Sequence, residues 1–367
     1  MASIPAGLAA TKIFSTPPLL GFVPVAAHFK LFGILVQYDR PATVQEVLAV
    51  YRENVAAGIY PEPVPGLLLI QDTLFAMAGL GLVDAQDDNV YNPNDITKHI
   101  VAQPSALHGG IHFSTEIFLA SAFLYPKLKA ENFQYPFHEC DTPMQYAHKL
   151  MGNERYANEH TYSIMADQGR MDSFNTFMTG KFFDVESNAE RLEKLAYDLD
   201  AVLETAPPEA VKMVDIGGGR GELLLHFKAA HPELQAKDLV VEEFNPDLGE
   251  IEGITQVQWN FKEDTPQPIK GAIIYHLAHV LHNLPDLDAL RLLQKISDAM
   301  APYSRILVHE MAKKPELAFL HSAMTVLYGG RERTPAEFWQ LGEMAGLKVT
   351  FEAFPPKGDG VIELMKV

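Results

Sequence analysis

The chain has 367 residues, of which 47% are hydrophobic and 21% are charged. This length exceeds the size at which one hydrophobic core keeps growing, so we expect more than one domain, and the composition excludes disordered and fibrous classes. The 29 Lys and Arg residues against 47 Asp and Glu residues give a formal net charge of −18. Because phosphate contacts supply most of the affinity for nucleic acid, this charge predicts that nucleic acid is not a partner. The one cysteine, Cys140, excludes an intrachain disulfide and a zinc site built from thiolates, and we expect a cytoplasmic protein.

The first predicted element along the chain is an apolar stretch at residues 19–36. It contains Pro24, His28 and Lys30, so its uninterrupted hydrocarbon is too short to span a membrane. It also lacks a basic leader followed by a small-residue cleavage site. We therefore expect a core helix or a dimer-forming helix and no membrane partner, with a helix on a membrane surface as the alternative.

Helical patterns dominate up to about residue 205. Residues 43–57 predict an amphipathic helix with Thr43 as N-cap, residues 67–78 a second helix and residues 79–91 a small hairpin. Two helices and a hairpin are typical of a winged helix, which serves either DNA binding or dimerisation, and the acidic charge favours dimerisation. We therefore expect a winged-helix-like dimerisation region at residues 1–110. A helical linker and pocket region at residues 111–205 follows, with helices at 114–129, 156–181 and 189–203.

The pattern changes after residue 206 to short apolar runs that alternate with amphipathic segments. The predicted strands are residues 212–216, 239–244, 255–261, 271–277, 305–312, 348–355 and 361–367, and the predicted helices are 221–230, 286–300 and 335–345. Strands that alternate with helices predict a mostly parallel sheet covered on both faces. The last two strands meet across a glycine-containing turn, which predicts an antiparallel hairpin. Residues 206–367 are therefore predicted to form one α/β domain.

The run VDIGGGRG lies where a predicted strand passes into a helix. Gly217, Gly218 and Gly219 allow the backbone to approach a ligand closely, and the helix that follows presents free N–H groups. Asp215 precedes them, and Glu243 belongs to an acidic pair at the end of the next predicted strand, where a carboxylate can accept ribose hydroxyls. The pattern predicts a nucleoside ligand at the carboxyl edge of the sheet. The alternative is a tight turn without a ligand.

The segment YHLAHVLHNLPD carries His276, His279 and His282 at intervals of three. A metal site would need these residues on one helical face, whereas the segment is predicted to leave a strand and enter a turn, so we expect no metal. One catalytic histidine fits better, because an imidazole can take a proton near neutral pH. Glu310 ends a predicted strand and Glu332 lies in GGRERT, and both are placed where they could orient such a histidine.

Together these motifs resemble the COMT-like S-adenosylmethionine-dependent O-methyltransferases, particularly their fungal secondary-metabolite branch. The resemblance covers most of residues 130–367 and rests on VDIGGGRG, KGAIIYHLAHVLHNLPD, SRILVHEM, LYGGRERT, TPMQYAH and SFNTFM. It implies an α/β class I methyltransferase fold, with a mostly parallel Rossmann-like sheet that ends in an antiparallel hairpin. It also implies a preceding, mainly α, winged-helix-like dimerisation domain and a homodimer.

The resemblance also implies roles for individual residues. The methyl donor S-adenosylmethionine, with S-adenosylhomocysteine as its product, would be held by Asp215, Gly217, Gly218, Gly219, Glu243, Asn260 and Phe261. His282 would be the general base, with Glu310 and Glu332 on either side of its ring. Phe174 and Met178, four residues apart on a predicted helix, match positions that line the acceptor pocket, although this spacing alone is more typical of core residues than of a pocket.

The chain departs from the family's pattern at three places. It has His-Asn-Leu at residues 282–284 where the family commonly has His-Asp-Trp, Ala278 where a basic residue is usual, and Asn260 where a carboxylate is usual. Two functions stay open. The first is O-methyl transfer to a phenol or enol hydroxyl of a small aromatic or polyketide-like secondary metabolite. The second is a pericyclase or cyclase that binds S-adenosylmethionine without transferring its methyl group.

Overall fold

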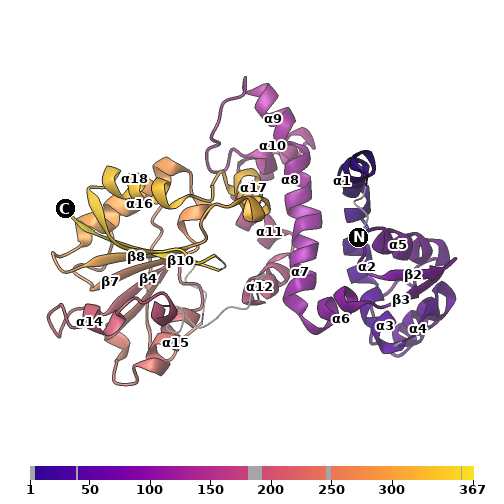
Figure 1. The fold of residues 1–367 in the computed structure, drawn as a ribbon, viewed down its shortest axis with the longest axis horizontal. Helices are drawn as coiled ribbons and strands as arrows, with labels where there is room; N and C mark the ends of the chain where they lie inside the picture. Colours follow the sequence, from indigo (N-terminus) through magenta and orange to yellow (C-terminus); the bar gives the residue numbers. More distant parts are fainter. Residues whose placement is uncertain (1–4, 39, 181–191, 245–248, 357) are drawn as a thin grey trace. The chain divides into compact units, whose positions relative to one another are not determined.

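The computed structural model describes residues 5–38, 40–180, 192–244, 249–356 and 358–367. The chain divides into two compact units. Of the described residues, the first unit holds 5–122 and 162–180, and the second holds 123–161 and the rest of the chain from residue 192 (Figure 1). Among the helices of these residues, none is both long and apolar enough to cross a membrane.

The first unit begins with several short helices, where the sequence predicted one continuous apolar helix. Its helices up to residue 112 are α1 (Ala6–Leu20), α2 (Val23–His28), α3 (Leu31–Tyr38), α4 (Val44–Ala56), α5 (Leu67–Gly79), α6 (Asp95–Ala102) and α7 (Pro104–His112). The prediction of a single helix over residues 19–36 is wrong, because this stretch covers the end of α1, all of α2 and most of α3. Pro24 has no N–H to donate, and Lys30 adopts a φ of 55°, which separates α2 from α3. The apolar side chains of α2 and α3 are buried in the core of this unit, as expected.

The predicted helix after Thr43 and the hairpin are confirmed. The Thr43 hydroxyl accepts a hydrogen bond from the Glu46 N–H, and the Glu46 carboxylate accepts one from the Thr43 N–H, so that a capping box starts α4. The hairpin strands β2 (Asp84–Asp87) and β3 (Val90–Asn92) join β1 (Ala42–Thr43) in a three-stranded antiparallel sheet with the order β1-β3-β2.

The three long helices predicted between residues 111 and 205 are interrupted. The first, 114–129, consists of a π-helix (Phe113–Ile117), α8 (Phe118–Ala122) and α9 (Leu124–Ala130), because Pro126 cannot donate the hydrogen bond that would continue α8. The second, 156–181, consists of a 3₁₀ turn (Tyr156–Asn158), α11 (Thr161–Asp167) and α12 (Met171–Gly180), with Gly169 at a φ of 65° between α11 and α12. The third, 189–203, begins outside the described residues. A turn with Ala196 at a φ of 58° interrupts it, and its end forms α14 (Leu199–Leu203).

The second unit contains the predicted α/β sheet. Its strands are β4 (Met213–Ile216), β5 (Leu239–Glu243), β6 (Thr255–Gln258), β7 (Ile274–Ala278), β8 (Arg305–Glu310), β9 (Leu347–Ala353) and β10 (Gly360–Lys366). Their order is β6-β5-β4-β7-β8-β10-β9, with the first five parallel and β10 antiparallel to both of its neighbours. The mostly parallel sheet with an antiparallel C-terminal hairpin is therefore confirmed.

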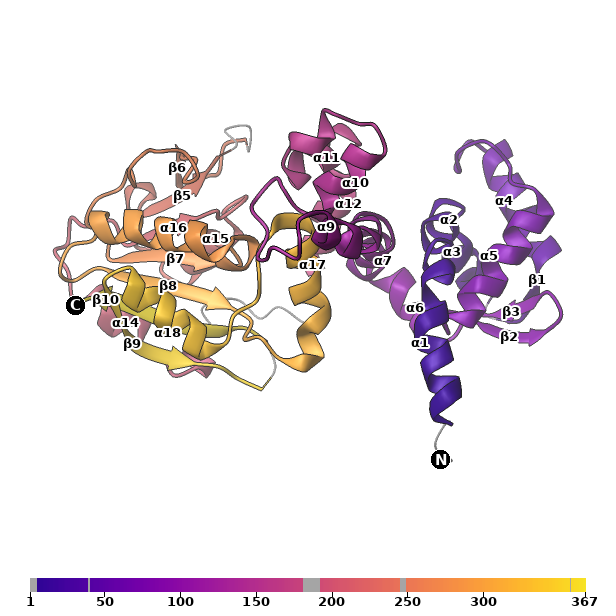
Figure 2. The ribbon, with the colours of Figure 1, turned by 90° about the horizontal axis from the view of Figure 1, so that it is seen from above.

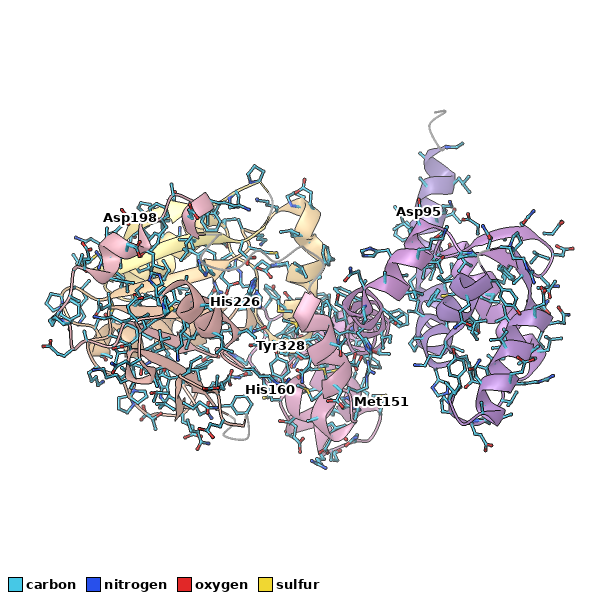
Figure 3. All side chains as sticks on the ribbon, turned by 90° about the horizontal axis from the view of Figure 1, so that it is seen from below. Asp95, Met151, His160, Asp198, His226 and Tyr328 are labelled. Atoms are coloured by element: carbon cyan, nitrogen blue, oxygen red, sulfur yellow. The ribbon has the colours of Figure 1, made fainter. Side chains whose placement is uncertain are left out.

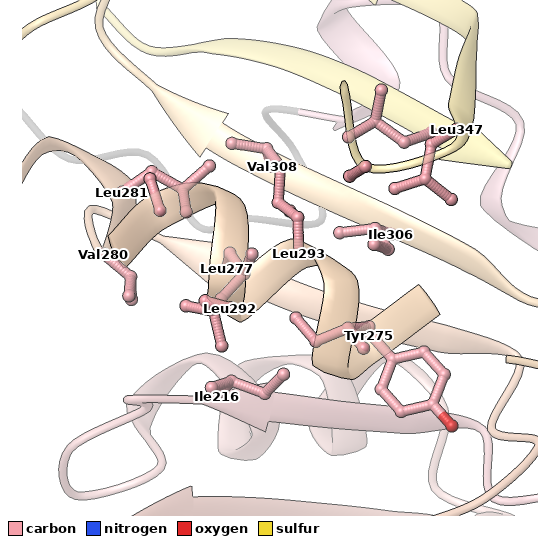
Figure 4. Packing of buried hydrophobic residues seen from close by; sticks show 14 of the residues in the cluster. Ile216, Tyr275, Leu277, Val280, Leu281, Leu292, Leu293, Ile306, Val308 and Leu347 are labelled. Carbon is pink, nitrogen blue, oxygen red and sulfur yellow. The ribbon is translucent and has the colours of Figure 1, made fainter. Parts of the chain in front are cut away.

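Helices cover both faces of this sheet. In Figure 1, α16 (Asp286–Ala299) and α18 (Pro335–Met344) lie over one face, and α14 and α15 (Glu222–Ala230) lie over the other. Figure 2 shows α16 and α18 from the side of the sheet that they cover. The core beneath them is drawn in Figure 4, where Leu292 and Leu293 of α16 lie close to side chains of the strands, namely Leu277, Ile306 and Val308. Burial of each such side chain contributes about 1.5–3 kcal/mol, which fixes the helix on the sheet.

The remaining helices of the second unit are α9, α10 (Pro143–Leu150) and α17 (Ala318–Tyr328). Thr142 caps α10 and pairs with Gln145 in a second capping box. His160 stacks on Tyr328 at the end of α17, with ring centroids 5.8 Å apart (Figure 3). The Thr161 hydroxyl also donates a hydrogen bond to the Leu327 carbonyl at 2.5 Å. These contacts fix the end of α17, from which the loop that carries Glu332 departs.

Candidate functional site

The glycine run forms a tight turn between β4 and α15. Gly217, Gly219 and Gly221 have φ values of 69°, 58° and 70°, which side chains rarely tolerate. A Cβ atom at Gly218 would overlap the Asp215 carboxylate directly below the turn. The positive φ values and the crowding at Gly218 therefore favour glycine at all four positions, and the turn brings bare backbone to the carboxyl end of the central strand.

The carboxylate of Glu243 lies against this turn. Its Oε1 accepts a hydrogen bond from the Gly219 N–H at 2.9 Å, and its Oε2 accepts one from the Phe244 N–H at 3.2 Å. Burial raises the pKa of Glu243, although both backbone donors oppose this change. The neighbouring Glu242 is fully buried and instead accepts a hydrogen bond from Gln267 at 2.8 Å. Of the acidic pair, Glu243 is the member placed to meet a ligand at the turn.

Asp215 lies beneath the turn and does not reach its surface. It is 2% exposed, and its Oδ1 is 2.8 Å from His276 Nδ1, while His276 Nε2 is 2.7 Å from His309 Nδ1. This buried chain crosses the adjacent strands β4, β7 and β8. Asp215 therefore supports the turn from below, and His276 is a satisfied polar residue of the core.

Asn260 and Phe261 follow β6, which ends three residues earlier than predicted. The Asn260 side chain accepts a hydrogen bond from the Lys262 N–H at 3.2 Å and donates one to Glu263 at 3.0 Å, which turns the chain out of the sheet. Phe261 packs edge to face with Trp259. Both residues are partly exposed. Because β4, β5 and β6 are parallel, these residues share one edge of the sheet with the glycine turn and Glu243.

His282 lies at the same edge, in a 3₁₀ turn (Leu281–Asn283) that follows β7. Its Nδ1 is 3.1 Å from Oε2 of Glu310, at the end of β8, and 3.4 Å from Oε1 of Glu332. The His282 backbone N–H also donates a hydrogen bond to Glu310 Oε1 at 3.2 Å. The structure therefore brings together all three residues that the sequence suggested for proton chemistry.

The charges around His282 change its acidity. Burial by itself would lower the pKa of His282, but the carboxylates of Glu310 and Glu332 outweigh it and raise the pKa to about 10. Burial would raise the pKa of Glu310, and the same ion pair lowers it instead. The site without a ligand therefore holds an imidazolium between two carboxylates at neutral pH.

A second histidine approaches this cluster. His279 has a φ of 55°, and its Nε2 is 3.0 Å from Oδ2 of Asp359, in the loop before β10, while its Nδ1 is 3.9 Å from Glu310 Oε2. Within the part of the chain that the structure describes, His279, His282 and Glu310 each offer one atom within 4.8 Å of the others, which is a spacing that could hold a divalent metal ion. Sequence reasoning missed Asp359, because only the antiparallel return of β10 beside β8 brings it there.

Two further residues fix the position of the His282 turn. The buried guanidinium of Arg333 donates to the carbonyls of Leu281 and Leu284 at 2.6 and 2.9 Å and pairs with Asp286. A Cβ atom at Gly330 would overlap the carbonyl oxygen of His282. The sequence signal for both was the same GGRERT segment that contains Glu332.

Phe174 and Met178 belong to α12 of the first unit, whereas the His282 cluster belongs to the second. The Phe174 ring contacts the rings of His112 and Tyr162 at centroid distances of 5.2 and 5.5 Å. Met178 is 38% exposed. Phe174 thus lies in an aromatic cluster, and Met178 lies toward the surface.

Comparison with known proteins decides the family. Residues 156–348 match the family model described as the O-methyltransferase domain. The chain belongs to this family. It is 50% identical to the O-methyltransferase bfoE of Aspergillus brasiliensis over 98% of this chain and 96% of that protein.

Solved structures share the fold of this O-methyltransferase at lower identity. One is described as a pericyclic reaction enzyme, with a TM-score of 0.78, 21% identity, and coverage of 100% of this chain and 90% of that one. Another is OxaC in complex with SAH and oxaline, with a TM-score of 0.79, 20% identity, and coverage of 100% and 88%. These two likenesses confirm the class I methyltransferase fold of the α/β region.

Proposed function

We propose that this family member transfers the methyl group of S-adenosylmethionine to a phenol or enol hydroxyl of a small aromatic or polyketide-like secondary metabolite. The observation that carries the proposal is the position of His282, between Glu310 and Glu332, at the sheet edge that also carries the glycine turn. A proton acceptor and a site for a nucleoside at one edge are the two parts that such a transfer needs.

The glycine turn and its neighbours fit the methyl donor. Gly217, Gly218 and Gly219 keep side chains away from the turn, and Glu243 places carboxylate oxygens beside it for the ribose hydroxyls. Asn260 and Phe261 lie at the adjoining strand end, suited to the adenine, while Asp215 supports the turn from beneath. When bound, S-adenosylmethionine supplies an electrophilic methyl group on a positively charged sulfur.

During methyl transfer, His282 exchanges a proton with the acceptor hydroxyl. The pKa of the ring, about 10, is close to the ordinary pKa of a phenol, so the proton moves between the two groups at little cost in free energy. Glu310 and Glu332 hold the ring in place and stabilise its charged form. Because the resting ring is already protonated at neutral pH, the reactive complex contains one proton fewer than the resting site.

The other regions complete the proposal. Residues 1–110 form a winged-helix-like dimerisation region, 111–205 a linker and pocket region in which Phe174 and Met178 line the acceptor site, and 206–367 the donor-binding domain. Exposed apolar side chains on α1 and α5 support a homodimer, namely Ile13, Phe14, Leu68 and Phe75. The net charge of −18 and the one cysteine support action in the cytoplasm without a nucleic-acid partner.

A second function is favoured by one observation, the charge on His282. An imidazolium is a strong hydrogen-bond donor that can polarise a substrate carbonyl, and one structural neighbour is described as a pericyclic reaction enzyme. In that case the protein would act as a pericyclase or cyclase, with the methyl group staying on the donor.

The test is to incubate the protein with S-adenosylmethionine and a panel of phenolic and enolic acceptors and to quantify both products by mass spectrometry. Methyl transfer yields S-adenosylhomocysteine and methylated acceptor in equal amounts. An altered acceptor without S-adenosylhomocysteine would instead establish the second function.

The donor site has its own test. Saturating S-adenosylmethionine, at a hundredfold excess over its dissociation constant, should stabilise the fold by about 2.7 kcal/mol. Gly218→Ala should abolish this stabilisation, whereas Gly33→Ala, at a position in α3 with open space for a Cβ atom, should leave it unchanged. Equal stabilisation of both variants would show that the donor binds elsewhere.

A further inference from the structure

Several polar atoms around His282 converge without aligned hydrogen bonds. Nδ1 of His282, Oε2 of Glu310 and Oε2 of Glu332 are buried, and within the described part of the chain they have no hydrogen-bond partner. His282 Nδ1 and Glu310 Oε2 are 3.1 Å apart, so they form an ion pair without the alignment of a hydrogen bond. Buried polar atoms that converge in this way are typical of a site that takes an ion or a water molecule.

His279 adds a second imidazole to these atoms. Its Nε2 lies 3.0 Å from Oδ2 of Asp359, so the carboxylate accepts the Nε2 proton and the neutral ring keeps its lone pair on Nδ1. This Nδ1 lies 3.9 Å from Oε2 of Glu310. A carboxylate that fixes the tautomer of a histidine is the usual outer partner of a metal-ligating imidazole. His279 is therefore oriented as a metal ligand would be.

The backbone at His279 has a conformation that is rare for residues other than glycine. Its φ is 55°, and hydrogen bonds hold it on both sides. The His279 N–H donates to the His309 carbonyl at 3.0 Å, and the Asn283 side chain donates to the His279 carbonyl at 3.1 Å. Strained backbone persists where the surroundings fix it, which is common at functional sites. These bonds keep the ring beside Glu310.

The distances between these atoms suit a small, four-coordinate cation. Zinc bonds of about 2.0–2.1 Å place neighbouring ligand atoms of a tetrahedron about 3.3 Å apart. His282 Nδ1 is 3.1 Å from Glu310 Oε2 and 3.4 Å from Glu332 Oε1. Ligand atoms of His279, His282 and Glu310 all lie within 4.8 Å of one another, so small movements of the rings complete the set. Imidazoles combined with carboxylates favour zinc, whereas calcium and magnesium prefer oxygen ligands alone.

We propose that this cluster binds a zinc ion and that the bound ion inhibits methyl transfer. The ligands are His279, His282, Glu310 and Glu332, and Asp359 is the outer partner of His279. The side chains of His279 and His282 are 14% and 16% exposed, so an ion reaches them from solvent.

Inhibition follows from the atom of His282 that zinc takes. Zinc on Nδ1 uses the lone pair that holds a proton in the resting ring, and the other proton stays on Nε2. The ring then has no lone pair with which to accept the proton of an acceptor hydroxyl. Zinc is thus an inhibitor and not a cofactor, and the metal-free protein is the active form. The inhibition rests on the proposed function, whereas the binding of zinc does not.

Binding is measured on metal-free protein, with Zn²⁺ by calorimetry and with Co²⁺ by visible absorption. The wild type should bind one ion per chain, and bound cobalt should show the intense bands of a four-coordinate ion. His279→Asn should remove the site, because asparagine tolerates the same backbone conformation but lacks the imidazole. Asp359→Ala should weaken binding by roughly 10- to 100-fold, as loss of an outer partner does.

An exposed histidine provides the matched control. His226 lies on α15 (Figure 3), and His226→Asn should bind zinc as the wild type does. A wild type without a one-to-one site, or equal binding by His279→Asn, overturns the inference. Loss of binding in His226→Asn also overturns it, because the ion would then lie on the surface. If the melting temperature shows that His279→Asn does not fold, Asp359→Ala decides in its place.

Inhibition is measured against the rate of each protein without zinc. Zinc should stop methyl transfer by the wild type at the concentration that fills the site, and His279→Asn should keep its own zinc-free rate at that concentration. Unchanged transfer by the zinc-filled wild type overturns the inhibition. If the wild type methylates no acceptor, the proposed function fails, and the calorimetric and cobalt measurements still decide whether the site exists.

Discussion

The two histidine clusters contain the same chemical groups in different proportions. In the second unit, His282 faces two carboxylates, Glu310 and Glu332, and its ring supplies a positive charge between them. In the first unit, His112 shares one carboxylate, Glu116, with the guanidinium of Arg170. The two carboxylates around His282 raise the pKa of its ring, whereas in the first unit one carboxylate is shared between a histidine and an arginine.

The largest effect is expected at His282. His282→Ala should lower kcat for methyl transfer by roughly 10² to 10⁴, which is the usual contribution of a general acid or base. The affinity for S-adenosylmethionine, measured by calorimetry, should stay unchanged because the glycine turn and Glu243 are untouched. Full methylation by this variant would remove His282 from the mechanism.

Loss of either carboxylate beside His282 should lower the rate of methyl transfer less than loss of His282 itself, and should also lower the pKa of His282. Glu310→Gln and Glu332→Gln should each reduce kcat by less than His282→Ala does, because they orient the ring without carrying the proton. Each should also lower the pKa of His282 from about 10 toward its ordinary value, because one stabilising negative charge is lost. Titration of the ring by NMR measures this change. An unchanged pKa in both variants would show that the ring does not owe its charge to these carboxylates.

Glu116 should stabilise the folded protein, and this stabilisation should depend on pH. Its pKa in the folded protein is about 2, below the ordinary value, so its stabilisation is complete above about pH 4.5 and is lost as the pH falls toward 2. Glu116→Gln should therefore reduce the free energy of unfolding by about 2 kcal/mol at pH 7, in urea titrations. The exposed control Glu154→Gln should stay within about 0.5 kcal/mol of the wild type. A neutral effect of Glu116→Gln would mean that Arg170 and His112 find other partners.

Metal removal is expected to have no effect. We interpret His279, His282 and Glu310 as a proton site, so a chelator should leave the rate of methyl transfer unchanged. Loss of activity on chelation, restored by zinc in the wild type but not in His279→Gln, would instead identify these residues as ligands of a metal that methyl transfer requires.

The α/β sheet was predictable because each of its strands has a local signal. Apolar runs bounded by turn residues located β4, β5, β7 and β8, and the alternation with helices predicted their parallel order. The first unit was less predictable, since single residues end its helices. The positive φ of Lys30 and the missing N–H of Pro126 interrupt helices that the apolar pattern alone predicts to be continuous.

The residues of the candidate site, like the elements of the fold, were predictable only where the sequence carries a local signal. His282, Glu310 and Glu332 were predicted because each lies at a strand end or in a turn. The carboxyl ends of parallel strands meet at one edge of the sheet, so these residues were expected to lie close together. Asp359 was not found, because its contact with His279 depends on the return of β10 along β8. The pairing of Glu116 with Arg170 was not found either, because the two are separated by an interruption between helices that sequence reasoning did not predict.

The pH dependence of methyl transfer, followed with a methyl-labelled donor in the wild type and in His282→Gln, shows whether His282 handles the proton of the acceptor. If the reactive complex has one proton fewer than the resting site, label should reach the acceptor, and the wild-type rate should rise with pH toward about 10, where His282 loses its proton. The variant, which has no ring to titrate, should stay far slower across the range. Consumption of the acceptor without transfer of label, with a rate that falls as the pH approaches 10, would rule out methyl transfer and identify the charged ring as a hydrogen-bond donor in a cyclase.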